Sequence, residues 1–383
     1  MRTRRDILGG SAGMAALAAM PAVASPPTPG SDGIDGQARR RGVRFGSCVA
    51  WSLPGADAGS FANPRYAALL KADCGLLVPE NALKWQATRP APDRFDFRRF
   101  DETIAWASQH GFRMRGHTLL WHHSRWFPKW LNDYPFGKEA AKQAEAILAG
   151  HINTVCARYG DRIFSYDVVN EAVDPDTGGY RETSLSRAMG GAEAVLDFAF
   201  HTARQAAPHA ELVYNDYMSW EAGNEKHREG VLRLLEGFRK RGTPVHTLGV
   251  QSHIGIFQPV RSVDELAAKL APEWRRFLDQ VVGMGYRLAI TEFDVRDRGL
   301  PAALPARDEA VAAYARHYLD LMLGYKQLRD VLVWGMSHRF SWLRTFEPRP
   351  DGEITRGSPT DMDLQVKPLH RAIAAALSGA APR

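Results

Sequence analysis

Cysteine is scarce in this sequence of 383 residues. The three cysteines are Cys48, Cys74 and Cys156, and none of them forms a CxxC pair, so the sequence gives no sign of a zinc site or a thiol redox motif. Cys48 and Cys74 fall in segments that we interpret as neighbouring strands. They could form one disulfide or remain buried free thiols. We predict no metal and no cofactor.

Long apolar runs and a strong charge of one sign are also absent from the body of the chain. Beyond the first 24 residues, no stretch is long and apolar enough to span a bilayer. The formal net charge is +6, a small excess that could suit an acidic polysaccharide but more simply indicates a solvated basic surface. With 45% hydrophobic and 24% charged residues, the chain is globular. We expect a monomer with no nucleic-acid partner and no stable membrane association.

The first 24 residues have the pattern of a secretory signal. Arg4 and Arg5 precede an apolar stretch rich in Ala and Gly over residues 7–23, and Ala22-Val23-Ala24 forms an A-x-A cleavage pattern. The arginine pair resembles twin-arginine signals, so we expect export to the periplasm or beyond. A membrane anchor is the alternative, but the apolar run is short for one.

Residues 25–42 follow as an expected flexible linker, because residues 25–36 are rich in Pro, Gly and Asp. Residues 43–383 would then form the folded domain. No internal repeat, low-complexity block or second module is evident in that part of the sequence.

Short β-rich runs alternate with helical patterns along the folded domain. The expected strands are residues 43–49, 74–78, 112–118, 163–169, 211–215, 247–252, 286–291 and 330–335. The expected helices are residues 98–110, 138–159, 193–207, 225–241, 263–283, 307–325 and a closing helix at 367–377. Such alternation predicts parallel βα units, and eight strands predict an α/β fold with a single (β/α)8 TIM barrel. An open doubly wound sheet is the alternative, but its GxGxxG motif is missing after the first strand.

Two of the expected strands end in carboxylates. The fourth ends in Asn170-Glu171 and the seventh continues into Glu292 and Asp294. Since active sites of such barrels lie at the carboxyl ends of the strands, both glutamates should face one cleft. A lone Glu at a strand end is more often a salt-bridge partner. A facing pair, with Asn immediately before the first, is more specific and is what glycoside hydrolysis requires.

The motifs around these glutamates resemble those of glycoside hydrolase family 10, whose main members are endo-β-1,4-xylanases. Residues 166–171 (Tyr-Asp-Val-Val-Asn-Glu) resemble its acid/base motif, and residues 290–294 (Ile-Thr-Glu-Phe-Asp) resemble its nucleophile motif. Further motifs that resemble the family occur at residues 80–85, 117–122, 215–217, 251–253 and 334–342. The resemblance extends from about Phe45 to about Pro368. It implies hydrolysis of internal β-1,4 bonds of xylan, with retention through a covalent glycosyl-enzyme.

The resemblance also implies a role for each matching residue. Glu292 would be the ionised nucleophile, and Glu171 the acid/base, with a raised pKa. Asn170 would bind the sugar 2-hydroxyl, His253 would donate to Glu292, and Asp294 would orient His253. The residues expected to bind xylan or xylo-oligosaccharides are Glu80, Asn81, Lys84, His117, Trp121, Asn215, Tyr217, Gln251, Trp334 and Trp342.

A few positions depart from the family pattern at places where it commonly contacts substrate. Ser124 stands where Gln is common, Ser337-His338 replaces Thr-Asp, and Met218 replaces Asn. These changes leave open another retaining β-1,4-glycanase or a xylo-oligosaccharide hydrolase. A non-catalytic carbohydrate-binding protein is disfavoured because both catalytic carboxylates are present.

Overall fold

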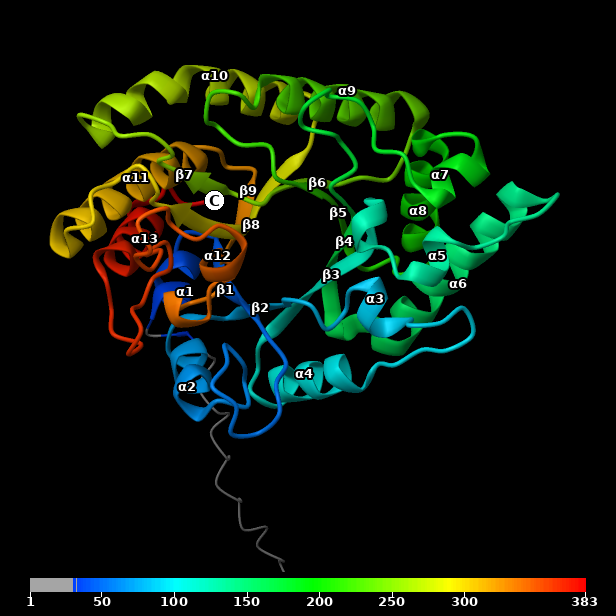
Figure 1. Ribbon diagram of the computed structural model, residues 1–383, viewed down its shortest axis with the longest axis horizontal. Helices are drawn as coiled ribbons and strands as arrows, with labels where there is room; N and C mark the ends of the chain where they lie inside the picture. The colour runs from blue at the N-terminus through cyan, green and yellow to red at the C-terminus, as the bar shows by residue number, and fades with distance from the viewer. Residues whose placement is uncertain (1–29, 32) are drawn as a thin grey trace, which may run out of the picture.

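The computed structural model describes residues 30, 31 and 33–383, which form a closed parallel barrel with helices around it (Figure 1). The strands that form the barrel wall are β1 (Arg44–Val49), β2 (Leu76–Pro79), β3 (Arg113–Trp121), β4 (Ile163–Asn170), β5 (Glu211–Asp216), β6 (Thr247–Val250), β8 (Arg287–Arg296) and β9 (Leu328–Val333). Neighbours pair in parallel from β1 to β6, and the β6–β8, β8–β9 and β9–β1 pairings close the ring. The predicted single (β/α)8 barrel is confirmed.

A ninth strand, β7 (His253–Gly255), was not predicted. Within the described residues it pairs only with the far end of β8, where His253 lies opposite Asp294. β8 makes this possible because it continues past the barrel wall to Arg296, five residues beyond the end expected from the sequence. The carboxyl end of the barrel is therefore extended on this side.

Helices cover the outside of the barrel (Figure 1). The longer ones are α2 (Pro64–Asp73), α4 (Arg98–Gln109), α6 (Ala140–Tyr159), α8 (Ala192–Ala206), α9 (Glu225–Arg241), α10 (Val263–Gly283), α11 (Leu304–Leu323) and α13 (Pro368–Gly379). The shorter ones are α1 (Ile34–Arg39), α3 (Trp85–Thr88), η1 (Ser124–Trp126), α5 (Lys129–Asn132), η2 (Gly160–Arg162), α7 (Ser184–Met189), η3 (His338–Phe340) and α12 (Leu343–Phe346).

Helix starts follow ordinary capping chemistry. The Ser262 hydroxyl accepts from the backbone N–H groups of Asp264 and Glu265 and so begins α10 where the sequence predicted. Asn63 caps α2 in the same way, with Pro64 at the first helical position. α2 was not predicted from the sequence because its apolar face is short.

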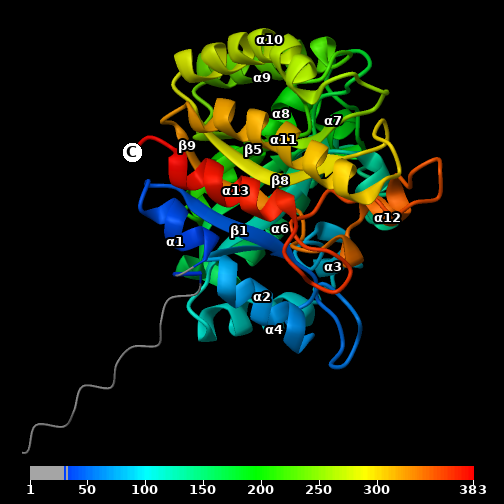
Figure 2. The same ribbon diagram turned by 90° about the vertical axis from the view of Figure 1, so that its left-hand side faces the viewer.

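The amino-terminal end of the domain differs from the expected linker over residues 25–42. Residues 34–39 form α1, in which Ile34 is buried and Asp35 accepts a hydrogen bond of 2.8 Å from the backbone N–H of Phe45 in β1. Figure 2 shows α11, α13 and α1 one below another along one side of the barrel. Composition alone suggested a linker, but one apolar and one acidic residue attach this segment to the barrel. The expected signal at residues 1–24 lies outside the described residues.

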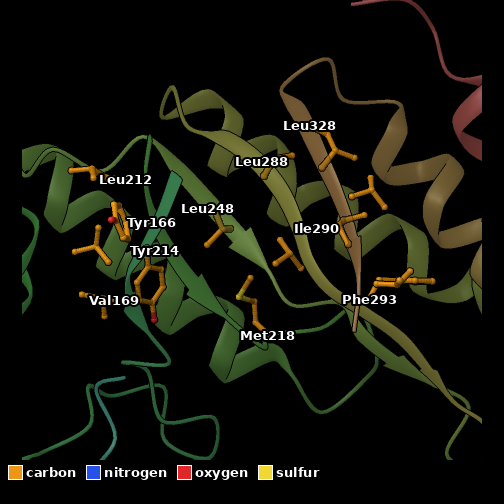
Figure 3. Close-up of a cluster of buried hydrophobic side chains, with 14 of the residues drawn as sticks. Tyr166, Val169, Leu212, Tyr214, Met218, Leu248, Leu288, Ile290, Phe293 and Leu328 are labelled. Carbon is orange, nitrogen blue, oxygen red and sulfur yellow. The ribbon is translucent and has the colours of Figure 1, made fainter. Parts of the chain in front are cut away.

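The core lies between the strands and the covering helices. Figure 3 shows part of it, with Tyr166, Leu212, Leu248 and Leu288 projecting from four successive barrel strands. The three cysteines are buried free thiols, so Cys48 and Cys74 form no disulfide. Within residues 30–31 and 33–383, no helix combines the length and apolarity needed to cross a membrane.

Candidate active site

A cleft of about 620 Å³ opens at the carboxyl ends of the strands. Figure 2 shows α3 and α12 at this end of the barrel. The structure brings the following predicted site residues into the lining of the cleft: Glu80, Asn81, Lys84, His117, Trp121, Asn170, Glu171, Tyr217, Gln251, His253, Glu292, Trp334 and Trp342. Asn215 and Asp294 lie behind this lining and act on it through hydrogen bonds and charge.

Glu171 follows directly after β4 in a strained backbone conformation. Its φ is 57°, in the left-handed region that costs a non-glycine residue on the order of 1–3 kcal/mol. The side chain accepts hydrogen bonds from Trp121 Nε1 at 2.8 Å, Gln251 Nε2 at 2.8 Å and Asn170 Nδ2 at 3.1 Å. These donors hold the carboxyl at one place in the cleft.

The environment of Glu171 favours its neutral form. Burial raises its pKa, hydrogen bonds from Gln251 and Trp121 lower it, and the negative charges of Asp216 and Glu292 raise it further. The net result is a pKa above the usual 4.5. This shift favours the protonated form of Glu171, which can give its proton to a leaving oxygen.

Glu292 lies in β8, in an environment that favours its ionised form. Asn215 Nδ2 donates to its Oε1 at 2.9 Å, and His253 Nε2 lies 3.4 Å from its Oε2. Burial alone would raise the pKa of Glu292, but the hydrogen bond from His253 and the charges of His117, His253 and Lys84 lower it to about 2. A pKa this low favours the ionised form of Glu292, which a nucleophile needs.

Residues behind the cleft keep His253 positively charged. Its Nδ1 lies 3.0 Å from Asp294 Oδ1, and Trp342 Nε1 donates to Asp294 Oδ2 at 2.7 Å. Burial would lower the pKa of His253, but Asp294 and then Glu292 raise it to about 9. A chain of contacts from Trp342 through Asp294 and His253 therefore keeps Glu292 anionic.

Three amide side chains connect the two glutamates. Asn215 Nδ2 donates to Asn170 Oδ1 at 2.9 Å as well as to Glu292, and Gln251 Nε2 contacts both Asn170 Oδ1, at 3.3 Å, and Glu171. The Thr291 hydroxyl donates to Asn215 Oδ1 at 2.7 Å, which fixes the orientation of that amide. The relative positions of the two carboxylates are therefore set by a buried network.

One wall of the cleft carries Lys84 and two tryptophans. Lys84 Nζ donates to Asn81 Oδ1 at 2.9 Å and lies 4.6 Å from the ring centroid of Trp121 and 6.0 Å from that of Trp334. Burial lowers the pKa of Lys84, although the negative charges of Glu292 and others oppose that effect. This wall offers the Lys84 amine as a hydrogen-bond donor beside flat apolar faces, a combination that suits a pyranose ring.

His117 completes the inner part of this wall. Its Nδ1 lies 2.9 Å from Asp167 Oδ2, and Arg115 binds the other oxygen of the same carboxylate. Nε2 is the ring nitrogen that Asp167 leaves unused. The buried pair behind His117 thus orients its ring in the cleft.

The model of the glycosyl hydrolase family 10 matches residues 34–376. The chain belongs to this family. Endo-1,4-beta-xylanase A of Fusarium oxysporum f. sp. lycopersici is 33% identical over 275 residues, which are 71% of this chain and 79% of the relative. Endo-1,4-beta-xylanase B of Thermotoga neapolitana is 28% identical over 298 residues, 77% of this chain and 78% of the relative.

Solved structures give the same assignment. Native xylanase 10B from Thermotoga maritima superposes with a TM-score of 0.77 at 26% identity, covering 90% of this chain and 98% of the relative. Xylanase 10B from Thermotoga petrophila RKU-1, solved in complex with xylobiose, gives a TM-score of 0.77 at 25% identity, covering 90% and 97%.

This family 10 chain also lines its cleft with residues that the sequence analysis missed. Trp126 in η1 stacks on Trp121, with 4.6 Å between ring centroids and 18° between planes, and Arg125 lies beside it. Arg296 at the end of β8 pairs with Glu347 at 2.9 Å. Trp126 could have been suspected from its closeness to Trp121, whereas nothing in the sequence links Arg296 with a residue 51 positions away.

None of the four positions that depart from the family pattern lines the cleft. Ser337 and His338 are fully buried, and Ser337 caps η3 by accepting from the N–H of Arg339. Met218 belongs to the core (Figure 3). Ser124 is exposed at the start of η1, outside the lining. The expectation that Ser337, His338 and Met218 alter the substrate rim is therefore wrong, because their side chains pack inward.

Proposed function

We propose that this protein is an endo-β-1,4-xylanase that cleaves internal bonds of xylan with retention. The observation that carries the proposal is that Glu171 and Glu292 line one cleft in surroundings that raise the pKa of the first and lower the pKa of the second. Two carboxylates with pKa values moved in opposite directions supply the acid and the nucleophile that retaining hydrolysis needs. The matched relatives named as xylanases support xylan as the polymer.

In the first step, Glu171 protonates the glycosidic oxygen while Glu292 attacks the anomeric carbon. The bond to the leaving sugar breaks as the bond to Glu292 forms. Glu292 then has no negative charge, so one of the causes that raise the pKa of Glu171 disappears. Glu171, now ionised, takes a proton from water, and that water releases the sugar from Glu292.

The remaining lining residues would place the substrate. Asn170 sits between the glutamates and is suited to bind the 2-hydroxyl of the sugar being attacked. Trp121, Trp334 and Trp342 give apolar faces to the pyranose rings. Tyr217 accepts a hydrogen bond of 2.8 Å from Arg181, which holds its ring on the acid/base side.

The covalent step can be trapped directly. A 2-deoxy-2-fluoro-xylobioside with a good leaving group slows the breakdown of a glycosyl-enzyme, so we expect peptide mass spectrometry to find one fluoroxylobiosyl group on Glu292. The Glu292→Gln variant serves as the control and should stay unlabelled. A wild-type enzyme that turns over xylan without ever becoming labelled would contradict the covalent mechanism.

We also propose that the chain is exported through a twin-arginine signal. Arg4 and Arg5, the apolar stretch after them and Ala22-Val23-Ala24 support this. Replacing both arginines by lysine keeps the charge but removes the recognised pair, so the uncleaved precursor should accumulate in the cytoplasmic fraction. Normal export of this variant would overturn the proposal.

A further inference from the structure

A second cavity of about 700 Å³ lies at the other end of the barrel from the catalytic cleft. Four of its lining residues are the first residues of their strands: Arg44 of β1, Arg113 of β3, Glu211 of β5 and Arg287 of β8. The other side chains that surround it include Phe164, Arg204, His209, His246 and Arg329. The cavity is therefore ringed by the amino-terminal ends of the strands, and no step of xylan hydrolysis uses it.

The charge around this cavity is strongly unbalanced. Its lining contains five arginines but one carboxylate. Arg44 pairs with Asp330 just outside the lining, and Arg287 Nη2 lies 2.9 Å from Glu211. The arginines that have no carboxylate partner among the described residues are Arg113, Arg204 and Arg329.

Two of these three guanidinium groups are held in place by the fold. Arg204 donates to the backbone carbonyls of Pro208 and Ala210, the latter at 3.0 Å. Arg113 lies over the ring of Phe164, 4.0 Å from its centroid, with Arg44 4.7 Å from the same centroid. Such contacts fix a planar guanidinium without neutralising it.

The N–H groups of Arg113 and Arg329 are available to a ligand, because neither side chain donates a hydrogen bond to the described part of the chain. Positive groups are also crowded here. Burial and the charge of Arg44 both lower the pKa of Arg113, and burial together with the charges of Arg204 and Arg287 lowers the pKa of His246 to about 4. A bound anion would offset the repulsion between these positive groups.

We propose that this cavity binds a small multivalent oxyanion of the phosphate or tricarboxylate class. Guanidinium forks match the oxygen spacing of both groups, and several converging forks favour an anion that carries more than one negative charge. The cavity is large enough for an anion of this size. A bound anion would stabilise the folded state, and it would not enter the catalytic cleft.

The test measures the melting temperature of the protein with inorganic pyrophosphate or citrate, each against sodium chloride at the same ionic strength. At about a hundredfold excess over Kd, a ligand that binds only the folded state raises the melting temperature of a domain of this size by about 4 °C. We expect a saturable rise of this size with at least one of the two anions. The anion that raises the melting temperature shows whether the cavity binds the phosphate or the tricarboxylate class.

The double variant Arg113→Gln/Arg329→Gln should lose this rise while keeping its activity on xylan, which shows that it is folded. The matched control Arg94→Gln/Arg371→Gln removes the same charge from exposed positions outside the cavity and should keep the rise. The proposal is overturned if neither anion exceeds sodium chloride, or if the cavity variant responds as the wild type does.

Discussion

Glu171 and Glu292 are both buried glutamates, and burial alone would raise the pKa of each. They differ in what faces them. Glu171 meets neutral donors and negative charges, whereas Glu292 meets His253, which Asp294 keeps positive. At the residue scale, the acid and the nucleophile are therefore distinguished by neighbours that come from different strands.

Removing His253 tests this distinction through the pH profile. His253 lowers the pKa of Glu292, so in His253→Asn that pKa should rise from about 2 toward the ordinary 4.5. Since only ionised Glu292 attacks, the acid limb of kcat/KM should move to higher pH by the same interval. The exposed His201→Asn serves as the control. An acid limb that stays in place would show that His253 does not control the charge of Glu292.

The raised pKa of Glu171 predicts dependence on the leaving group. Glu171→Ala should lower kcat/KM for phenyl xylobioside by about 10²–10⁴, because phenoxide needs a proton to leave, but much less for the dinitrophenyl analogue. Steady-state rates on both substrates measure the two losses in kcat/KM, and the exposed Glu309→Ala serves as the control. Equal losses on both substrates would argue against an acid role.

At the scale of elements, the strand ends could be predicted from the sequence, whereas the loops could not. Glu171 and Glu292 follow apolar runs typical of buried strands, so their common cleft followed from the parallel barrel. β7 and the Arg296–Glu347 pair escaped prediction because they depend on how far β8 extends past the barrel. Ser337 and His338 were misjudged because their sequence position says nothing about which way a loop side chain turns.

At the scale of elements, the contribution of the α10 cap to the free energy of unfolding can also be tested. Ser262→Ala removes the acceptor for two N–H groups at the start of α10 and should lower the free energy of unfolding by about 1 kcal/mol. Urea unfolding measures the change. Ser108→Ala, an exposed position inside α4 where no cap is lost, should change it little. Equal effects of the two substitutions would mean that the cap does not stabilise α10.

At the scale of the whole molecule, one closed barrel separates two kinds of surface. The carboxyl ends of the strands carry the glutamates and tryptophans of the cleft, and the amino ends carry the arginines of the second cavity. The sequence predicted the barrel because eight apolar runs alternate with helical patterns over its length. The predicted linker was wrong at residues 34–39. This Gly-containing segment resembles a linker in composition, but Ile34 and Asp35 attach the segment to β1 and its neighbours.

The most direct test of the account compares reducing ends released from β-1,4-xylan and from a soluble β-1,4-glucan by the wild type and by Glu292→Gln. We predict strong release from xylan, little from glucan, and release at background level from the variant. Preference for glucan, or action on xylo-oligosaccharides but on neither polymer, would contradict the xylanase assignment. Near-normal hydrolysis of xylan by Glu292→Gln would contradict the mechanism itself.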